Sequence, residues 1–399
     1  MELEIEVPSH FLCPISMQPM KDPVTISTGI TYDRESIHKW LFTCTRTTCP
    51  VTKQPLSSTD LIPNHTLRRL IHSWSTTTSL PASHPIPAPK NQIANLLHDA
   101  KTDPRNQITC LRKLRSVITC MENDIDLAHL GLFEFLTTVM LTENETSVSF
   151  VTEACDEALT ILHHLKFSDL TLRKVNGLGL PKALLHVMTF GTVPSRSRAV
   201  ILLRSVFKVM DRSQIGCVDP VVFTQTGRIL KLKVSQQTIK ACLEVVVDVV
   251  KWGRNRIKAA ESGIVFALID LLIESADRRI CELALVALEQ ICRCAEGRAG
   301  LVEHAAGLAT VSKKILRVSH VGSDRAVRIL CSVCRFCGSD GVLHEMVEVG
   351  VVAKLCLMIQ IDYSERTKER VKEVLILHSR VWKGASCVPA HLLSSYPSL

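Results

Sequence analysis

Apolar residues recur with a helical period through most of the chain, from residue 92 onward. Within this pattern, small or apolar residues mark similar helices at a regular interval, at Leu114, Ala158, Ala199, Ala241, Ala284, Ala326 and Val371. The spacings are 44, 41, 42, 43, 42 and 45 residues. A fixed period in the low forties is typical of solenoids whose units contain two or three helices. We therefore predict a helical repeat array.

Glycines between consecutive helices keep the same phase. Each stands after one helical stretch and before a new apolar run, with spacings of 44 and 43 residues, at Gly263, Gly307 and Gly350. A glycine in this place can take the left-handed conformation that ends a helix. We predict the same role for Gly131. The pattern weakens between residues 177 and 227, so no repeat boundaries are predicted there.

The first 74 residues follow another pattern, with short stretches instead of long helical ones. Residues 22–32 predict a hairpin of two strands that turns near Gly29. Asp33 stands where its carboxylate can cap a helix that begins near Arg34. Apolar residues then recur at helical spacing, at Ile37, Trp40 and Leu41. These features predict a small α+β domain.

A proline-rich stretch separates the two patterns. Residues 75–92 contain few groups that could pack and four prolines, namely Pro81, Pro85, Pro87 and Pro89. Such a composition is typical of an extended linker. We predict four segments, which are a small domain at 6–78, a linker at 79–91, the repeat array at 92–385 and a tail at 386–399.

Composition and charge favour packed helices and a protein partner. Hydrophobic residues make up 46% of the chain and aromatic residues only 5%, as in helical proteins. The net charge is +8, and the excess lies in the array, because residues 1–78 hold seven basic and seven acidic residues. No five like charges run together and no aromatics interleave with basic residues, which argues against nucleic acid. No uncharged apolar stretch of about 18 residues occurs, so we predict no membrane span.

The sixteen cysteines are scattered along the chain. Because no secretory signal pattern is recognised, we expect reduced thiols and a cytoplasmic location. One group forms C-x2-C-x2-C, at Cys331, Cys334 and Cys337. Phe336 and its neighbours give this stretch an apolar helical pattern, so we predict buried helix thiols in place of a metal or redox site.

Two segments of the small domain have the form of zinc knuckles that lack their second cysteine. They are Cys13–Ser16 and Cys49–Thr52. A cross-braced zinc domain needs eight paired Cys or His ligands, whereas only Cys13, His38, Cys44 and Cys49 lie between the knuckles, without a C-x2-C pair. We therefore predict a domain without metal, and no cofactor.

The period and its landmarks resemble armadillo repeats over residues 92–385. The resemblance is clearest at 261–272, which read E-S-G-x-V-x-x-L-I-x-L-L. HEAT-like repeats are the alternative. Either family implies a curved solenoid whose concave groove binds a protein partner.

Residues 11–74 resemble the U-box family in the order of their motifs. These are C-P-I at 13–15, D-P-V at 22–24, T-Y-D-R at 31–34, I-x-x-W at 37–40, C-P at 49–50 and L-I-P-N at 61–64. A U-box before armadillo repeats is similar to the plant U-box ligases in particular. The implied fold is mainly α, with a small α+β metal-free U-box domain followed by a right-handed armadillo-like α-solenoid.

The U-box resemblance implies a surface that binds an E2 ubiquitin-conjugating enzyme. The contact positions of the family match Pro14, Ile15, Trp40 and Pro50. Lys53 matches a place where many members carry a cation, more often arginine, that bridges E2 and ubiquitin; lysine lacks the planar fork of arginine. From the residues alone, Ile15, Trp40 and Pro50 fit an ordinary core, because an apolar residue at helical spacing usually is a core residue, and only the family resemblance favours a contact role.

The resemblance further implies a ligase that orients the ubiquitin thioester of the E2 for attack by a substrate lysine, without a nucleophile of its own. The implied partners are an E2, ubiquitin and a protein substrate in the armadillo groove. Two alternatives stay open, namely a repeat adaptor whose first domain only mediates assembly, and a ligase that forms a thioester on one of its cysteines. The sequence does not decide the substrate, the E2, the ubiquitin linkage or whether the chain forms a homo-oligomer.

Overall fold

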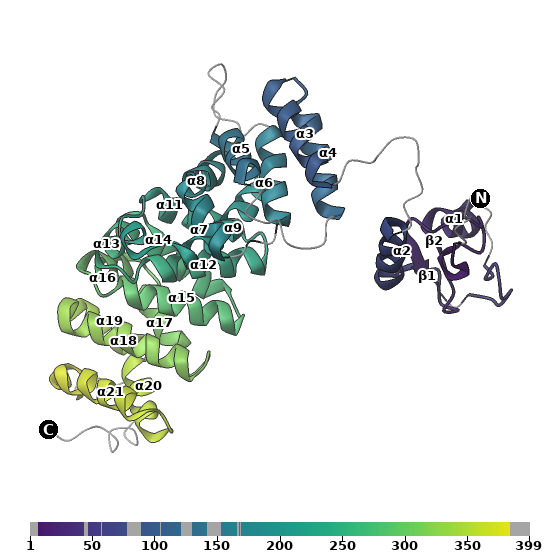
Figure 1. Cartoon of the computed structure of the whole chain (residues 1–399). Coiled ribbons are helices and arrows are strands. Elements are labelled where there is room, and N and C mark those ends of the chain that lie inside the picture. Colours follow the sequence, from purple (N-terminus) through teal and green to yellow (C-terminus); the bar gives the residue numbers. More distant parts are fainter. Residues whose placement is uncertain are drawn as a thin grey trace, which may run out of the picture. The chain divides into compact units, whose positions relative to one another are not determined.

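The structure is a computed structural model that describes residues 7–43, 47–56, 58–77, 89–103, 105–120, 130–141, 153–165, 167 and 169–383. It divides into two compact units, Met1–Ala88 and Pro89–Leu399 (Figure 1). The second unit begins with helix α3 (Pro89–Thr102), whose first residues belong to the predicted linker. The rest of that linker, the predicted tail and Cys44 lie outside the described residues.

A three-stranded antiparallel sheet lies in the N-terminal unit. Strand β1 (Pro23–Thr25) lies between β2 (Thr31–Asp33) and β3 (Ile62–Pro63). Strands β1 and β2 form the predicted hairpin, in which Gly29 has a φ of 81° at the turn. This left-handed conformation suits glycine because it has no Cβ.

Short helices accompany this sheet, and the unit buries a small core. They are the 3-10 helix η1 (Ser9–Phe11), α1 (Arg34–His38), the π-helical turn η2 (Lys39–Thr43) and α2 (His65–Thr77). The core contains eight buried apolar side chains, from Cys13, Met20, Val24, Ile26, Tyr32, Ile37, Leu41 and Cys49. Because so small a core stabilises a domain only weakly, specific polar contacts must contribute.

Asp33 precedes α1 as predicted, but the predicted capping hydrogen bond is wrong. Its carboxylate Oδ1 accepts from the backbone N–H groups of Lys21 at 2.8 Å and Asp22 at 3.0 Å. No side-chain bond from Asp33 reaches the N–H groups of α1. The carboxylate therefore holds the segment before β1 against the start of α1.

The C-terminal unit is a stack of helices (Figure 1). After α3 come α4 (Gln107–Cys120), α5 (Leu130–Leu141), α6 (Glu153–His164), α7 (Asp169–Gly177), α8 (Leu180–Phe190), α9 (Val193–Val209), α10 (Arg212–Ile215), α11 (Val221–Leu232) and α12 (Gln236–Val249). Further along are α13 (Gly253–Glu261), α14 (Ile264–Glu274), α15 (Arg278–Ile291), α16 (Ala295–Glu303), α17 (Gly307–Lys314), α18 (His320–Cys337), α19 (Asp340–Glu348), α20 (Val351–Gln360), α21 (Glu365–Leu377) and α22 (Ser379–Lys383). Among the described residues, no helix combines the length and apolar character needed to cross a membrane.

The predicted repeat positions all fall in the last helix of a repeat. They lie in α4, α6, α9, α12, α15, α18 and α21, and every one of them is buried. Each of these helices packs against the next along the array. The periodic prediction is therefore confirmed, and the alanines at five of these positions allow neighbouring helices to approach closely. We call α9, α12, α15, α18 and α21 the third helices.

Polar caps fix the start of each third helix. A side-chain oxygen accepts from the backbone N–H three residues further on, at Thr192, Ser235, Asp277, Ser319 and Ser364. Each cap satisfies a donor that the beginning of a helix leaves unpaired. The third helices thus begin at matching places in successive repeats.

Glycine marks helix boundaries only in part of the array. Gly263 and Gly350 have φ values of 78° and 72° and precede α14 and α20, as predicted. Gly307 differs because it is the first residue of α17, and a Cβ there would overlap the carbonyl group of Leu301. The prediction for Gly131 is wrong, since this residue lies inside α5.

Residues 177–227, where no repeat boundaries were predicted, contain one boundary that is marked by proline instead of glycine. Gly179, with a φ of 90°, separates α7 from α8 in the usual way. One repeat later, Pro220 precedes α11, and the helix before it, α10, has only four residues. Proline suits the start of a helix because its φ is fixed and it lacks an N–H group. Glycine positions alone therefore do not reveal the repeat spacing here.

Candidate functional site

Two loops of the N-terminal unit share one sequence pattern and one backbone shape. Cys13–Pro19 reads C-P-I-S-M-Q-P and Cys49–Pro55 reads C-P-V-T-K-Q-P. In each loop the N–H group of the fifth residue donates to the carbonyl of the cysteine, at 2.8 and 2.9 Å. These fifth residues, Met17 and Lys53, have φ values of 52° and 60°. The same conformation therefore presents the middle residues of both loops.

Hydrogen bonds surround the sulfur of Cys49. Its Sγ accepts from Thr28 Oγ1 at 3.4 Å and from the N–H of Thr52 at 3.5 Å, and lies 3.1 Å from the hydroxyl of Tyr32. Burial raises the pKa of the Cys49 thiol, but the hydrogen bonds from Thr28, Thr52 and Tyr32 outweigh it and lower the pKa to about 6. These contacts fix the second loop against the hairpin.

The first loop is held to the hairpin in a similar way. Cys13 Sγ accepts from the backbone N–H of Asp33 at 3.3 Å. Burial raises the pKa of the Cys13 thiol, but hydrogen bonds from Asp33, Ser16 and Ile15 outweigh it and lower the pKa. Across the described residues, no group of three or more His, Cys, Asp or Glu side chains is arranged to hold a metal ion. Both sulfurs instead connect a loop to β2.

The four predicted contact residues lie on these loops or beside them. Pro14 is exposed in the first loop, and Pro50 is half-buried in the second. Ile15 and Trp40 are half-buried and pack against the small core. The indole Nε1 of Trp40 also donates to the carbonyl of Thr48 at 2.9 Å, directly before the second loop. Ile15 and Trp40 thus belong partly to the core and partly to the surface.

Lys53 connects the end of the second loop with Trp40. Its Nζ lies 5.7 Å from the centroid of the Trp40 ring, within the range of a cation–π contact. The positive φ of Lys53 is maintained by its hydrogen bond to the carbonyl of Cys49. The structure therefore brings Trp40, Pro50 and Lys53 together around the second loop.

Exposed apolar residues of this unit were missed by the sequence prediction. Met17 is 74% exposed in the first loop, and Val51 and Phe42 are exposed as well. Alignment of the two loop sequences would have singled out Met17, because it occupies the position that Lys53 has in the second loop. These residues add apolar surface to the loops and to the end of η2.

The second candidate site is the surface of the array formed by the third helices and their caps, which we call the third-helix face. Ion pairs link each third helix or its cap to the next, between Arg204 and Glu244 at 3.5 Å, Lys240 and Asp277 at 3.7 Å, Arg325 and Glu289 at 3.2 Å, and Arg370 and Asp324 at 3.3 Å. Arg335 and Glu373 form a further pair between α18 and α21. Charged side chains therefore extend along this face from repeat to repeat.

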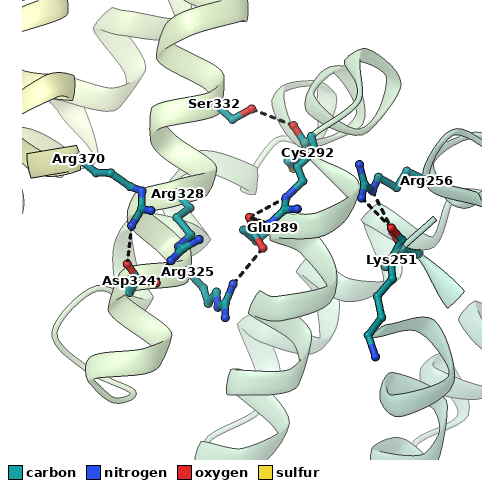
Figure 2. Close-up of polar contacts among 11 residues, drawn as sticks. Lys251, Arg256, Glu289, Cys292, Asp324, Arg325, Arg328, Ser332 and Arg370 are labelled. Atoms are coloured by element: carbon teal, nitrogen blue, oxygen red, sulfur yellow. Dashed lines mark hydrogen bonds and ion pairs between the residues drawn. The ribbon is translucent and has the colours of Figure 1, made fainter. Parts of the chain in front are cut away.

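In Figure 2, the carboxylates of Glu289 and Asp324 each form ion pairs with two arginines. Each binds one arginine close in sequence and one from the following repeat, with Arg293 and Arg325 on Glu289, and Arg328 and Arg370 on Asp324. The hydroxyl of Ser332 also donates to the carbonyl of Cys292 at 2.9 Å, which joins α18 to the end of α15. Polar contacts thus fix the spacing of the third helices.

The cysteine cluster in α18 is structural, with one departure from the prediction. Cys331 and Cys334 are buried, and burial raises the pKa of Cys334 to about 12. Phe336 was predicted to continue the apolar stripe but is 65% exposed, with the guanidinium of Arg298 at 4.5 Å from its ring centroid. Because a helix advances 3.6 residues per turn, the half-buried Cys337 follows the core side in place of Phe336.

Known proteins match both units. The model of the U-box domain matches residues 7–80, and the model described as plant U-box protein ARM repeat region matches residues 92–398. Over its full length the chain is 44% identical to "E3 ubiquitin-protein ligase PUB23" and 42% identical to "E3 ubiquitin-protein ligase PUB22", both from Arabidopsis thaliana, and covers 98% and 100% of them. It is 31% identical to "E3 ubiquitin-protein ligase PUB24" of the same plant, again over the full chain and 98% of the relative.

These matches agree with the architecture of the two units. The U-box model covers the sheet and the paired loops, and the repeat model covers the stacked helices, which identifies the repeats as armadillo rather than HEAT repeats. Both models and the full-length relatives show that the chain belongs to the plant U-box proteins with an armadillo repeat region.

Proposed function

We propose that the chain is an E3 ubiquitin-protein ligase whose N-terminal unit binds an E2 that carries ubiquitin, while the armadillo array holds the substrate. The observation that carries this proposal is the pair of matched loops, the second of which is joined to Trp40, in a unit that matches the U-box model. The full-length relatives named E3 ubiquitin-protein ligases support the same activity.

The E2 docks, in this proposal, on Pro14, Ile15, Pro50 and Trp40. The half-buried state of Ile15 and Trp40 supports this role, since side chains already fixed by a core lose little entropy on binding. Apolar and aromatic anchors of this kind contribute most of the binding energy at protein interfaces. The exposed loop residue Met17 extends the same apolar surface.

Lys53 is proposed to contact E2 and ubiquitin together. Its ammonium group lies beside Trp40, at the edge of the proposed E2 surface. A cation in this place can hold ubiquitin close to the E2 and so restrict its orientation. A lysine provides a point charge without the bidentate geometry of arginine, so we expect a weaker restraint than an arginine would give.

No nucleophile of the ligase takes part in the proposed reaction. The thioester on the E2 is already activated, and the ligase lowers the barrier by holding the thioester and the substrate lysine in a productive geometry. The array thiols of Cys242 and Cys292 are poorly suited to form a thioester, because burial raises the pKa of both. Cys13 and Cys49 have a lowered pKa but are fully buried.

An autoubiquitination assay with a panel of E2 enzymes tests the proposal. The full chain should form ubiquitin conjugates with at least one E2, and none when the E2 is omitted. The absence of conjugates with every E2 would favour the adaptor alternative. A ubiquitin adduct on the ligase that disappears on treatment with a reducing thiol would favour the alternative with its own thioester.

A further inference from the structure

The basic excess of the chain is concentrated on the third-helix face. The five third helices and their caps together contain fourteen Lys and Arg residues but only nine Asp and Glu residues. The first 78 residues, by contrast, are electrically balanced. An excess of like charge on one face produces a positive potential that attracts anionic partners and opposes the compact state. A binding role would explain why the array carries this excess.

The excess positive charge recurs in successive repeats. Three carboxylates of the third helices are each contacted by two cations, of which at least one comes from a neighbouring repeat, namely Glu244 by Arg204 and Lys208, Glu289 by Arg293 and Arg325, and Asp324 by Arg328 and Arg370. These clusters belong to three consecutive repeats, and Figure 2 shows the second and third of them. Each cluster keeps one positive charge after its own carboxylate is neutralised.

Two arginines in these clusters are incompletely paired. The Nε groups of Arg204 and Arg325 are buried and have no hydrogen-bond partner. Their ion pairs with Glu244 and Glu289 measure 3.5 and 3.2 Å, which is longer than a strong charge-assisted bond. The two side chains are 27% and 28% exposed, so N–H groups other than the buried Nε can donate to a second carboxylate.

We propose that the third-helix face from α9 to α21 binds an acidic segment of a partner protein. This role, which rests on the ligase function proposed above, assigns a chemical class to the substrate that the array selects. An extended segment with several Asp or Glu residues can place one carboxylate on each cluster, because the surplus charge recurs from repeat to repeat. A single negative charge would engage only one of the clusters.

The shortage of exposed aromatic side chains on this face favours a protein over a nucleic acid. Sites for single-stranded nucleic acid combine a basic groove with aromatic side chains for stacking. The third helices hold two such residues, of which Phe207 is buried and only Phe336 is exposed.

Fluorescence anisotropy with labelled peptides and the full chain tests the proposal. A peptide of alternating Glu and Gly should bind, a Gln–Gly peptide of equal length should not, and binding should weaken as ionic strength rises. The double variant Lys208→Glu with Arg335→Glu should weaken binding about tenfold or more, since it reverses two charges on the face. Lys182→Glu with Lys231→Glu is the matched control, because both lysines are exposed on the second helices α8 and α11. It should leave the affinity unchanged within about twofold.

The variant Glu244→Gln gives an independent check that needs no charge reversal. It removes one carboxylate of the face while keeping its size, and should tighten binding of the Glu–Gly peptide about threefold. The proposal fails if the Glu–Gly peptide does not bind, if both double variants weaken binding equally, or if an oligodeoxynucleotide binds more tightly and displaces the peptide. Autoubiquitination of the same samples separates the two proposals, since a chain that modifies itself but does not bind this peptide overturns only the acidic-segment proposal.

Discussion

The two units of the chain are held together in different ways. The N-terminal unit has a core of eight side chains and depends on single polar contacts at Cys13, Cys49 and Asp33. The array repeats one helix contact from α4 to α21 and begins its third helices with similar caps. In a solenoid, stability is approximately a sum over repeats and neighbouring contacts. One substitution should therefore disturb the whole first unit but only a local part of the array.

The largest effect is expected from removal of residues 1–78. The remaining array should stay helical and bind its substrate, because its packing contacts lie between neighbouring repeats, but ubiquitin transfer should be lost completely. Circular dichroism and a transfer assay check the two parts. A fragment that is helical but no longer binds a substrate of the full chain would contradict this division of labour.

Substitution Cys49→Ala should destabilise the N-terminal unit by about 2 kcal/mol, because it leaves the buried donors around the sulfur unpaired. The matched control is Cys242→Ala in α12, which replaces a buried thiol with hydrogen among apolar neighbours. We expect a loss of stability of about 1 kcal/mol there. Hydrogen exchange measured separately for each unit gives both values. Equal losses in the two units would show that the contacts of Cys49 contribute nothing beyond packing.

Substitution Lys53→Ala should slow transfer about tenfold, equal to 1.4 kcal/mol, while the affinity for free E2 stays nearly unchanged. The reason is that its proposed contact involves ubiquitin as well as the E2. Transfer rates under single-turnover conditions and E2 binding by calorimetry should be compared. A parallel loss of both quantities would indicate that Lys53 is only an E2 contact.

The lowered pKa of Cys49 predicts a pH dependence confined to the N-terminal unit. The folded-state pKa of about 6 lies below the usual thiol value of 9.0. The ionised thiol therefore contributes full stability above pH 9, less as pH falls from 9 to 6, and none below pH 6. Hydrogen exchange should show this trend in the wild type and a shallower one in Cys49→Ser, where Cys13 keeps its own lowered pKa. The same slope in both proteins would rule out Cys49 as its source.

The smallest effect is expected for Asp324→Asn in the array. This change weakens the pairs with Arg328 and Arg370 and should cost about 1 kcal/mol, because the side chains are partly exposed and the neighbouring contacts remain. Faster hydrogen exchange should be confined to α18 and α21. Exchange that accelerates through the whole array would mean that the repeats are more strongly coupled than the account assumes.

The repeat array could be predicted well because its cause is periodic. The five positions from Ala158 to Ala326 are alanine since neighbouring helices meet there, and the positions at the two ends, Leu114 and Val371, are larger but also buried. Gly307 stands between two helices as predicted, but the reason is close approach of the backbone and not a positive φ, while Gly131 shows neither feature.

The polar contacts could not be predicted in the same way. The carboxylate of Asp33 accepts from the backbone N–H groups of Lys21 and Asp22 instead of those of α1. This contact depends on the tertiary fold, which places the segment before β1 next to the end of β2. The pair between Arg204 and Glu244 was missed, although its separation of 40 residues is close to the repeat spacing of 41 to 45 residues. Testing opposite charges about one period apart would have found it.

The central claim is that the loops beside Trp40 promote ubiquitin transfer directly from an E2. Single-turnover discharge of the E2–ubiquitin thioester onto free lysine, with the full chain present, tests it most directly. Ile15→Ala should slow discharge about thirtyfold, equal to about 2 kcal/mol. The matched change Ile62→Ala, at a 63% exposed residue of β3, should leave discharge unchanged. A folded Ile15→Ala protein as active as the wild type, or ubiquitin that passes first to a thiol of the ligase, would contradict the account.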